Sequence, residues 1–306
     1  MSAAFEEALK SRKIYFQKNV VTATLSTFGI GGICAYLVEP NCLGELTDTV
    51  ALCRLLSLSY AVIGRASNVL FDDEALPKVI VRTTRLDAVK KGEDGLLLCD
   101  CGASLQRIFR LAATLGFSDL LFASGIPGTV GGGVYMNAGA YGSSIGELVK
   151  YATAFQVDSC KIRTYFNKEL NFNYRSSDFQ RNSAVILQVA LQLSRYGEPR
   201  EIVASARQLA ARRAAAQPLS MPSAGSTFLR TENGESMGKI IDELGLKGLR
   251  CGNAAVSEKH AGFIVNLGGA TASDVRLLIL SIQEIVEKKY GFRPVPEIRY
   301  ITEKET

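Results

Sequence analysis

Residues 124–142, SGIPGTVGGGVYMNAGAYG, constrain the fold of this chain more than any other stretch. Glycine loses more conformational freedom on folding than other residues, so a high glycine density weakens any helix or strand. Two structures would offset that cost: a backbone that turns repeatedly through positive φ, or a ligand that lies against the main chain. Glycine density alone favours neither. The glycines are Gly125, Gly128, Gly131, Gly132, Gly133, Gly139 and Gly142.

The segment does not match the two common glycine-rich nucleotide motifs. In a Rossmann fingerprint, Gly131 and Gly133 would require a third glycine at the position of Met136. The stretch GIGGIC fails in the same way at Cys34, and the chain has no G-K-[ST] sequence for a P-loop. What remains is a run of backbone amides and tight turns, which would let a flat or phosphate-bearing ligand approach the main chain.

A second turn lies in VIGRASNVLF, residues 62–71. Gly64, Ser67 and Asn68 directly follow a short apolar strand. Serine and asparagine at such a turn can donate to phosphate oxygens through both side chain and backbone. Taken alone, these residues would be interpreted as an ordinary Asx turn. When they are considered together with the glycine-rich segment, these residues favour a ligand-binding interpretation.

Size and charge limit the class of partner. At 306 residues, 47% apolar and 21% charged, the chain is long enough for two or three compact units. Its net charge is +5 and its basic residues occur in isolated pairs, which suits an anionic small ligand and does not predict nucleic-acid binding. The first thirteen residues lack an apolar signal region, and the longest apolar run is too short for a bilayer, so no membrane attachment is expected.

The cysteine and histidine content limits the kinds of metal binding and catalysis that the chain can support. None of the seven cysteines forms a C-x-x-C pair, and Cys99 and Cys101 are expected to fill the core as small apolar residues. This usage predicts a reduced, cytoplasmic location. His260 is the only histidine, so polyhistidine zinc sites are excluded and no metal is expected. Proton chemistry would therefore depend largely on Ser, Glu, Lys, Tyr or Arg side chains.

Strand and helix patterns alternate along the chain and predict an α+β fold. Apolar, β-branched runs predict strands at 60–64, 78–83, 95–102 and 184–194. Helical spacing predicts helices within 104–117, 200–217 and 273–291. Gly116 and Gly291 are expected to end the first and last of these, and Ser273 is expected to be the N-cap of the last. A change of composition near 200–225 indicates a linker into a C-terminal α+β domain.

These motifs resemble, in order, those of the UDP-N-acetylenolpyruvoylglucosamine reductases, the flavoenzymes that complete UDP-N-acetylmuramate in bacterial cell-wall synthesis. GRASN and the glycine-rich segment resemble the FAD-binding half of the family. The short connection after YRSS is similar to the subgroup that lacks an extra tyrosine-bearing loop. Each motif alone is weakly specific, but their combination over nearly the whole chain is highly specific. The further motifs are FNYRSSDF (172–179), PSAGSTF (222–228), GLKG (245–248), AAVSEKHAGFIVN (254–266) and VPEIRYI (295–301).

The resemblance implies a PCMH-type FAD-binding fold of two α+β subdomains, followed by a C-terminal α+β substrate-binding domain. The two subdomains are expected at 1–84 and 85–200, and the substrate-binding domain at 201–306. A C-terminal strand would return Glu297 to the active site. The family binds FAD noncovalently, takes hydride from NADPH and acts on a UDP-sugar, so the same cofactor, co-substrate and small-molecule partner are expected here.

The resemblance also implies a cofactor site at the two turns. The glycines would make room for the pyrophosphate and ring of the flavin, and the 64–68 turn would hold the pyrophosphate from the other side. The expected cofactor-binding residues are Ile63, Gly64, Arg65, Ala66, Ser67, Asn68, Gly125, Ile126, Pro127, Gly128, Thr129, Gly132, Gly133, Asn137, Ala138 and Gly139.

The family's reaction needs a cation that stabilises negative charge and a group that delivers a proton. The resemblance places Arg175 and Glu297 at the charge-stabilising positions and Ser226 as the proton donor. An arginine can form a fork with a carboxylate, and an enediolate-like intermediate is basic enough to take a proton from a hydroxyl. Without the resemblance, these residues would be interpreted as a surface ion-pair partner, an exposed carboxylate and a turn serine.

Three further residues are expected to face the UDP-sugar: Arg230, His260 and Arg213. A single histidine is otherwise more often a hydrogen-bonded structural residue. The chain departs from the family's pattern at two places. Ala66 stands where the family has a glycine in the 64–68 turn. Residues 229–231 read Leu-Arg-Thr, where the family usually has a basic or polar residue, then Asn or Arg, then Pro.

Two other functions remain compatible with these residues. The first is a flavin oxidase of the same fold that acts on a sugar or lactone. Many such oxidases attach FAD through histidine, and residues 1–259 contain none. The second is a non-catalytic UDP-sugar sensor, which would bind no flavin and would not need the full set of glycines.

Overall fold

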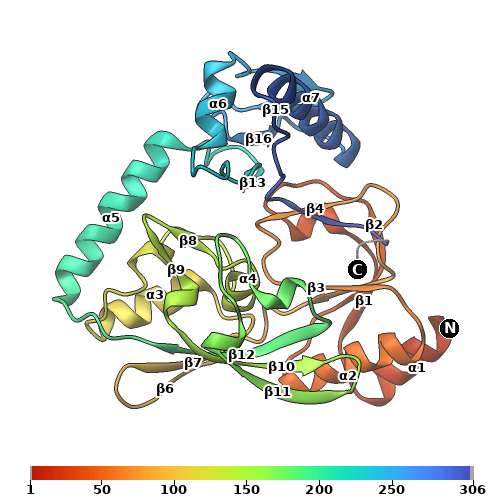
Figure 1. The fold of residues 1–306 in the computed structure, drawn as a ribbon. Helices are drawn as coiled ribbons and strands as arrows, with labels where there is room; N and C mark the ends of the chain where they lie inside the picture. Colours follow the sequence, from red (N-terminus) through yellow and green to blue (C-terminus); the bar gives the residue numbers. More distant parts are fainter. Residues whose placement is uncertain (1, 304–306) are drawn as a thin grey trace. The chain divides into compact units, whose positions relative to one another are not determined.

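The computed structural model describes residues 2–303, and its contacts divide the chain into two compact units (Figure 1). The first unit contains the residues up to Gln17 together with 36–65 and 79–211, and the second contains 18–35, 66–78 and the residues from Arg212 onward. The chain therefore passes from one unit to the other more than once, and one of these crossings lies within the 64–68 turn.

A four-stranded sheet begins the fold, in the strand order β1-β2-β5-β3. Strand β5 pairs in parallel with β2 on one side and with β3 on the other, and its residues 79–81 are fully buried. Such burial is typical of a parallel strand that is covered on both faces. The predicted strands at 60–64 and 78–83 are confirmed as β3 and β5. The elements are α1 (Ser2–Ser11), β1 (Phe16–Val21), β2 (Ile33–Val38), α2 (Leu43–Leu55), β3 (Tyr60–Ile63) and β5 (Val79–Arg82).

An antiparallel sheet of five strands forms the larger layer of the first unit, in the order β11-β10-β12-β7-β6. The predicted strands at 95–102 and 184–194 are confirmed as its neighbours β7 and β12. Cys99 and Cys101 are buried core residues as predicted, and burial raises the pKa of both thiols to about 12. The strands are β6 (Val89–Lys91), β7 (Leu96–Asp100), β10 (Val149–Gln156), β11 (Lys161–Phe166) and β12 (Ala184–Gln192).

Two helices pack in the same unit. Helix α3 (Leu105–Thr114) buries one apolar stripe and is followed by Gly116 at φ +80°, which confirms the predicted helix and its glycine end. Helix α4 (Val130–Tyr135) is formed by the glycine-rich segment and contacts β7 and β12. A helix with three consecutive glycines has poor intrinsic stability, so its packing must hold it in place.

The second unit contains an antiparallel sheet, β13-β16-β15-β14, together with two helices. Strands β4 and β17 form a separate parallel pair in this unit. One apolar core joins α6 and α7 to the sheet. The elements are β4 (Val69–Phe71), β13 (Ser223–Ser226), α6 (Met237–Glu243), β14 (Arg250–Cys251), β15 (Ala254–Val256), β16 (Phe263–Asn266), α7 (Ala272–Tyr290) and β17 (Arg299–Ile301).

Helix α7 confirms the predicted C-terminal helix and its glycine end, but the predicted N-cap was wrong. Gly291 has φ +76°, as expected for a left-handed helix terminus. The N-cap is Thr271 instead of Ser273. Its side chain accepts from Asp274 N–H at 3.0 Å, and the Asp274 carboxylate accepts from Thr271 N–H at 3.0 Å. This reciprocal capping box outweighs a lone serine in the first turn.

Helix α5 (Pro199–Ala216) confirms the predicted helix at 200–217, and the boundary between the two units falls within it, after Ala211. Only Ile202 of this helix is buried. The helices and strands together confirm an α+β fold. Over residues 2–303 the structure contains no helix of the length and apolarity that crossing a membrane would require.

Candidate active site

The glycine-rich segment folds back on the chain around α4. The Thr129 side chain accepts from Gly132 N–H at 3.3 Å as the N-cap of the helix. A Cβ on Gly131 would lie 2.9 Å from the Cys101 carbonyl oxygen. A Cβ on Gly133 would lie 3.3 Å from Leu105 Cδ1. Both glycines are buried, so contacts within the protein explain their small size without a ligand.

Gly132 differs from these two neighbours. It is exposed, and a Cβ there would meet no atom of the described chain closer than Thr129 Oγ1 at 3.4 Å. At an exposed helix position, alanine is more stable than glycine by about 1 kcal/mol. The fold therefore gives no reason for glycine at this position, whereas a ligand lying against the helix would.

A two-residue hairpin ends the glycine-rich segment. Strands β8 (Gly139–Ala140) and β9 (Ser143–Ser144) pair across Tyr141 and Gly142, whose φ values are +55° and +84°. Two consecutive positive φ angles are typical of a type I′ turn, which explains Gly142. A Cβ on Gly139 would lie 2.5 Å from the Ser143 carbonyl oxygen, so this glycine is also required by the chain itself.

Gly64, at the start of the 64–68 turn, lies against the start of α4. A Cβ on Gly64 would lie 2.2 Å from Thr129 Oγ1, so only glycine permits this approach. Among residues 2–303, the N–H groups of Arg65, Ala66 and Ser67 donate to no protein acceptor. Consecutive N–H groups of this kind form a concave site that suits an anion.

Ala66 adopts the backbone angle that favours glycine, with φ +46°, and its methyl group is buried. We expect Ala66→Gly to change the free energy of unfolding by less than about 1 kcal/mol. Relief of about 1–2 kcal/mol of left-handed strain opposes the loss of a buried methyl group and the added chain entropy. Ala61→Gly, at a buried strand position in β3, has no strain to relieve and should cost more than about 1 kcal/mol. Urea unfolding measures both, and equal losses would contradict the assignment of strain to Ala66.

Arg175 lies in a tight turn beside this segment. The turn is closed by reciprocal backbone hydrogen bonds between Asn173 and Ser176, at 3.0 and 3.1 Å, and Arg175 itself has φ +52°. One guanidinium nitrogen donates to the Gly139 carbonyl at 3.1 Å, and the guanidinium lies 5.3 Å from the centre of the Tyr174 ring. The structure therefore places the predicted arginine directly beside the glycine-rich segment.

Asn137, which was expected to bind cofactor, has a structural role for its side chain. Its amide donates to the Asn173 carbonyl at 2.8 Å and accepts from Gly146 N–H at 2.9 Å. The residue is buried and has φ +43°. Asn137 thus connects the Arg175 turn to the end of the glycine-rich segment, and asparagine tolerates the left-handed angle better than most residues.

The second unit brings Ser226 and Glu297 together. Glu297 N–H donates to the carbonyl of Thr227, the residue after Ser226, at 2.8 Å. Asn68 Nδ2 donates to the Glu297 carbonyl at 3.1 Å, because β17 pairs in parallel with β4 immediately after the 64–68 turn. Ser226 is exposed and Glu297 is partly exposed. Two predicted catalytic residues and one predicted cofactor residue therefore meet at this point, while Arg175 belongs to the first unit.

The predicted substrate residues have partners of their own. Arg230 is exposed and donates to the Gly234 carbonyl at 2.9 Å within its own loop. Arg213 lies in the last turn of α5. His260 Nδ1 accepts from Gly262 N–H at 3.1 Å, and its ring lies edge-on to Phe263 with the ring centres 4.9 Å apart. This bond leaves the Nε2 position for the proton of the neutral imidazole.

Burial lowers the pKa of His260 below its ordinary value of 6.5, and nearby Lys247 lowers it further. The folded state thus binds a proton less readily than the unfolded state. The stability that this histidine contributes is therefore present above pH 6.5 and is lost as the pH falls through the folded-state pKa. Because the chain has one histidine, a single imidazole proton signal in an NMR titration reports this pKa directly. A value of 6.5 or higher in the folded protein would contradict the burial argument.

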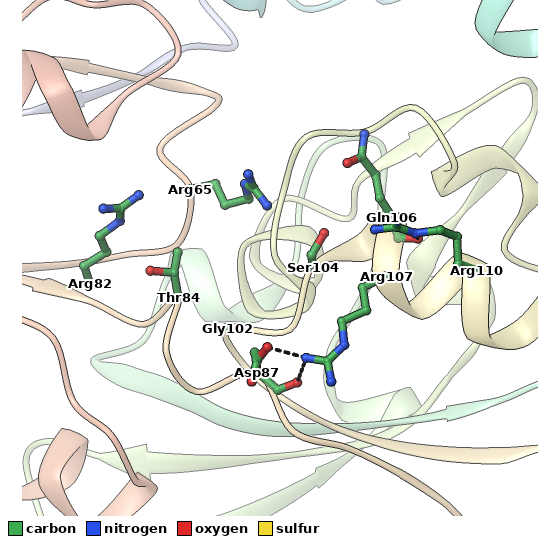
Figure 2. Close-up of a pocket in the computed structure, with 9 residues that line it drawn as sticks. All are labelled: Arg65, Arg82, Thr84, Asp87, Gly102, Ser104, Gln106, Arg107 and Arg110. Carbon is green, nitrogen blue, oxygen red and sulfur yellow. Dashed lines mark hydrogen bonds and ion pairs between the residues drawn. The ribbon is translucent and has the colours of Figure 1, made fainter.

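The first unit contains a pocket of about 500 Å³ that the sequence analysis did not predict (Figure 2). Four arginines and one aspartate are among its lining residues, so the lining carries a net positive charge although Arg82 and Arg107 are ion-paired with Glu39 and Asp87. Arg107 turns toward Asp87, where its NH1 donates to the Asp87 carbonyl at 2.8 Å. Arg82 Nε is buried and, within the described chain, has no hydrogen-bond partner. The lining residues are Arg65, Arg82, Thr84, Asp87, Gly102, Ser104, Gln106, Arg107 and Arg110.

This arginine pocket adjoins the candidate cofactor residues. Ser104 forms an isolated β-bridge with Thr129, and Leu105 N–H donates to the Gly128 carbonyl at 3.0 Å. Arg65 belongs to both the pocket and the 64–68 turn. The spacing of Arg107 and Arg110, three residues apart on one helix face, was the only sequence signal for the pocket.

Comparisons with known proteins agree over almost the whole chain. Residues 34–159 match the model of an FAD-binding domain, and residues 217–301 match the C-terminal domain of UDP-N-acetylenolpyruvoylglucosamine reductase. The enzyme of that name from Caldicellulosiruptor saccharolyticus is 40% identical over 304 residues, which cover 99% of this chain and 97% of the relative. The one from Thermotoga petrophila is 42% identical over 274 residues, which cover 88% and 93%.

A solved structure is similar as well. The crystal structure of UDP-N-acetylenolpyruvylglucosamine reductase from Thermus caldophilus matches with a TM-score of 0.76 and 30% sequence identity. The match covers 94% of this chain and 98% of that one. Similarity of this extent includes both the glycine-rich segment and the C-terminal motifs.

Proposed function

Because the chain belongs to the UDP-N-acetylenolpyruvoylglucosamine reductase family, we propose that it is an FAD-dependent oxidoreductase that reduces the enolpyruvyl group of UDP-N-acetylglucosamine enolpyruvate. NADPH is the hydride donor and UDP-N-acetylmuramate, a peptidoglycan precursor, is the product. The observation that carries this proposal is identity of 40% over 99% of the chain. Cell-wall biogenesis, cell shape and cell division depend on such a precursor, and its synthesis belongs in the cytoplasm.

The backbone of the 64–68 turn, the glycine-rich segment and the arginine pocket each fit a bound FAD. The pyrophosphate of FAD is a dianion, and the N–H groups of Arg65 to Ser67 together with the arginine pocket supply donors of matching charge. Gly132 leaves an exposed backbone surface for the cofactor. We assign the binding role to the residues expected from the family's motifs at 63–68, 125–129, 132–133 and 137–139, and add the arginine pocket for the pyrophosphate.

When bound, FAD would supply to the methylene carbon of the enolpyruvyl group the hydride that it takes from NADPH. Negative charge then develops on the neighbouring carbon and its carboxylate. The positively charged guanidinium of Arg175 stabilises this negative charge. Its hydrogen bond to the Gly139 carbonyl orients it before the substrate binds.

Ser226 donates the proton that completes the reduction, through its exposed hydroxyl at the end of β13. Glu297, whose backbone is bonded to the residue after Ser226, shares in stabilising the charge and in supplying that proton. The backbone bond between Glu297 and Thr227 holds the two backbones in place, so only the side-chain rotamers must bring the hydroxyl and the carboxylate to the substrate.

Arg230, His260 and Arg213 contact the UDP-sugar in this proposal. Arg230 and Arg213 carry charge for the diphosphate, and the Nε2–H of neutral His260 can donate a hydrogen bond. The partner is a small molecule, with no role for nucleic acid or membrane. We propose the corresponding division into FAD-binding subdomains at 1–84 and 85–200 and a substrate-binding domain at 201–306.

Product analysis tests the proposed reaction. The purified protein is incubated with NADPH and UDP-N-acetylglucosamine enolpyruvate, and the mass of the sugar nucleotide is then measured by mass spectrometry. We expect a gain of about 2 Da, the mass of the added hydride and proton. Unchanged substrate together with oxygen-dependent oxidation of a sugar would identify an oxidase instead.

A further inference from the structure

Gln180 lies outside every motif described above, yet its side chain contacts the edge of the candidate active site. Its Nε2 donates to the Arg175 carbonyl at 3.0 Å and to the Tyr135 carbonyl at 2.8 Å. An amide nitrogen carries two hydrogens, so both bonds can form at once. The side chain is partly buried, where such bonds are shielded from competing water.

The first of these contacts acts on a strained residue. Arg175 has φ +52°, an angle that L-residues other than glycine rarely adopt. Residues in such conformations persist only where the surrounding structure holds them. The reciprocal bonds between Asn173 and Ser176 close the turn, but the carbonyl of Arg175 itself is held by Gln180.

The second contact connects the turn to the glycine-rich helix. Tyr135 is the last residue of α4, where helix carbonyls lack partners within the helix. Its carbonyl accepts from Gln180 and also from Ser177 Oγ, at 2.8 Å each. Arg175 is thus fixed to this segment at two places, through its backbone by Gln180 and through its guanidinium by the Gly139 carbonyl.

We propose that Gln180 is a positioning residue for Arg175, holding the strained turn against the end of α4 so that the guanidinium meets the developing charge of the substrate. This inference rests on the proposed function. Misplacing a charge-stabilising group by about 1 Å can cost about 100-fold in rate. Loss of the Gln180 bonds therefore slows the step that uses Arg175 and leaves other steps unchanged.

Three substitutions of Gln180 distinguish the effect of its hydrogen-bond donor from the effect of its side-chain volume. Gln180→Met keeps a similar length without donors, Gln180→Glu puts an acceptor against two carbonyls, and Gln180→Lys keeps a donor. The matched control is Gln156→Met, because Gln156 is a half-buried glutamine of the same unit that donates to the Tyr165 hydroxyl at 3.2 Å. Stopped-flow absorbance measures reduction of bound flavin by NADPH and its reoxidation by the enolpyruvyl sugar separately.

The proposal predicts that Gln180→Met slows reoxidation by about 10- to 100-fold and keeps FAD affinity and the NADPH step. Gln180→Glu should slow reoxidation at least as much. Gln180→Lys should keep most of the parent reoxidation rate, and Gln156→Met should leave that rate unchanged. In an Arg175→Ala background, Gln180→Met should add no further loss, because it acts through the arginine. Equal slowing of both half-reactions, or full additivity with Arg175→Ala, would overturn the proposal. If Arg175→Ala itself leaves reoxidation unchanged, the proposed function fails first, so the two failures are distinguishable.

Discussion

Arg175→Ala should slow reoxidation of the reduced flavin by the enolpyruvyl sugar about 100- to 1,000-fold, the usual cost of removing one electrostatic donor from a transition state. In the proposed reaction the guanidinium provides a full charge for the substrate carboxylate, and the structure orients it through a bond to the Gly139 carbonyl at 3.1 Å. The reoxidation rate of Arg175→Lys should lie between those of the parent protein and Arg175→Ala, because a lysine keeps the charge but cannot form two parallel hydrogen bonds with a carboxylate. Rapid-mixing absorbance of the flavin under nitrogen measures the rate.

The control for this prediction is Arg181→Ala. Arg181 lies six residues further along the same segment, is exposed and pairs with Asp178 at 3.7 Å on the surface. It should leave both half-reactions unchanged. FAD content and reduction by NADPH should stay within a few fold of the parent protein for the Arg175 variants. A loss of flavin in Arg175→Ala, without a slower reoxidation in the flavin-loaded fraction, would assign the arginine to cofactor binding.

Gly132→Ala should weaken FAD binding while it leaves the flavin-free protein as stable as before or more stable. The position is exposed and helical, so alanine should stabilise the apoprotein by up to about 1 kcal/mol. A methyl group pressed against a close-fitting cofactor costs about 1–3 kcal/mol, which corresponds to about 5- to 150-fold in affinity. Fluorescence titration of the apoprotein with FAD measures the affinity, and thermal unfolding measures the stability.

Gly131→Ala is the matched contrast, because it makes the same change one residue earlier in the helix. Its Cβ would lie 2.9 Å from the Cys101 carbonyl oxygen and 3.0 Å from Cys101 Cβ. Backbone must move to admit it, so the apoprotein itself should lose about 1–3 kcal/mol of stability. If Gly131→Ala and Gly132→Ala changed apoprotein stability and FAD affinity alike, Gly132 would not face a ligand while Gly131 packs within the protein.

Regular elements were predictable from the sequence because their signals are local. Gly116 and Gly291 end their helices as expected, since a left-handed terminus needs only the glycine and the preceding apolar stripe. The wrong N-cap at Ser273 is also a local matter. Thr271 and Asp274 form a T-x-x-D capping box, and this signal is stronger than that of the lone serine inside the first turn.

The roles of individual glycines were not predictable, because they depend on distant parts of the chain. Gly131 and Gly132 are equivalent in sequence, and only the position of Cys101, thirty residues earlier, separates them. The motifs that resemble those of the family indicated Arg175, Ser226 and Glu297, but not which contacts hold each residue. Gln180 and the arginine pocket were missed for the same reason, since their contacts join residues that are far apart in the chain.

The visible spectrum of the purified protein, followed under nitrogen, tests the central claim most directly. The account predicts flavin absorbance that bleaches on addition of NADPH and returns when UDP-N-acetylglucosamine enolpyruvate is added. A protein that takes up no FAD would contradict the account and leave a UDP-sugar sensor. A flavin that bleaches but regains its colour only when air is admitted would also contradict it and would indicate an oxidase.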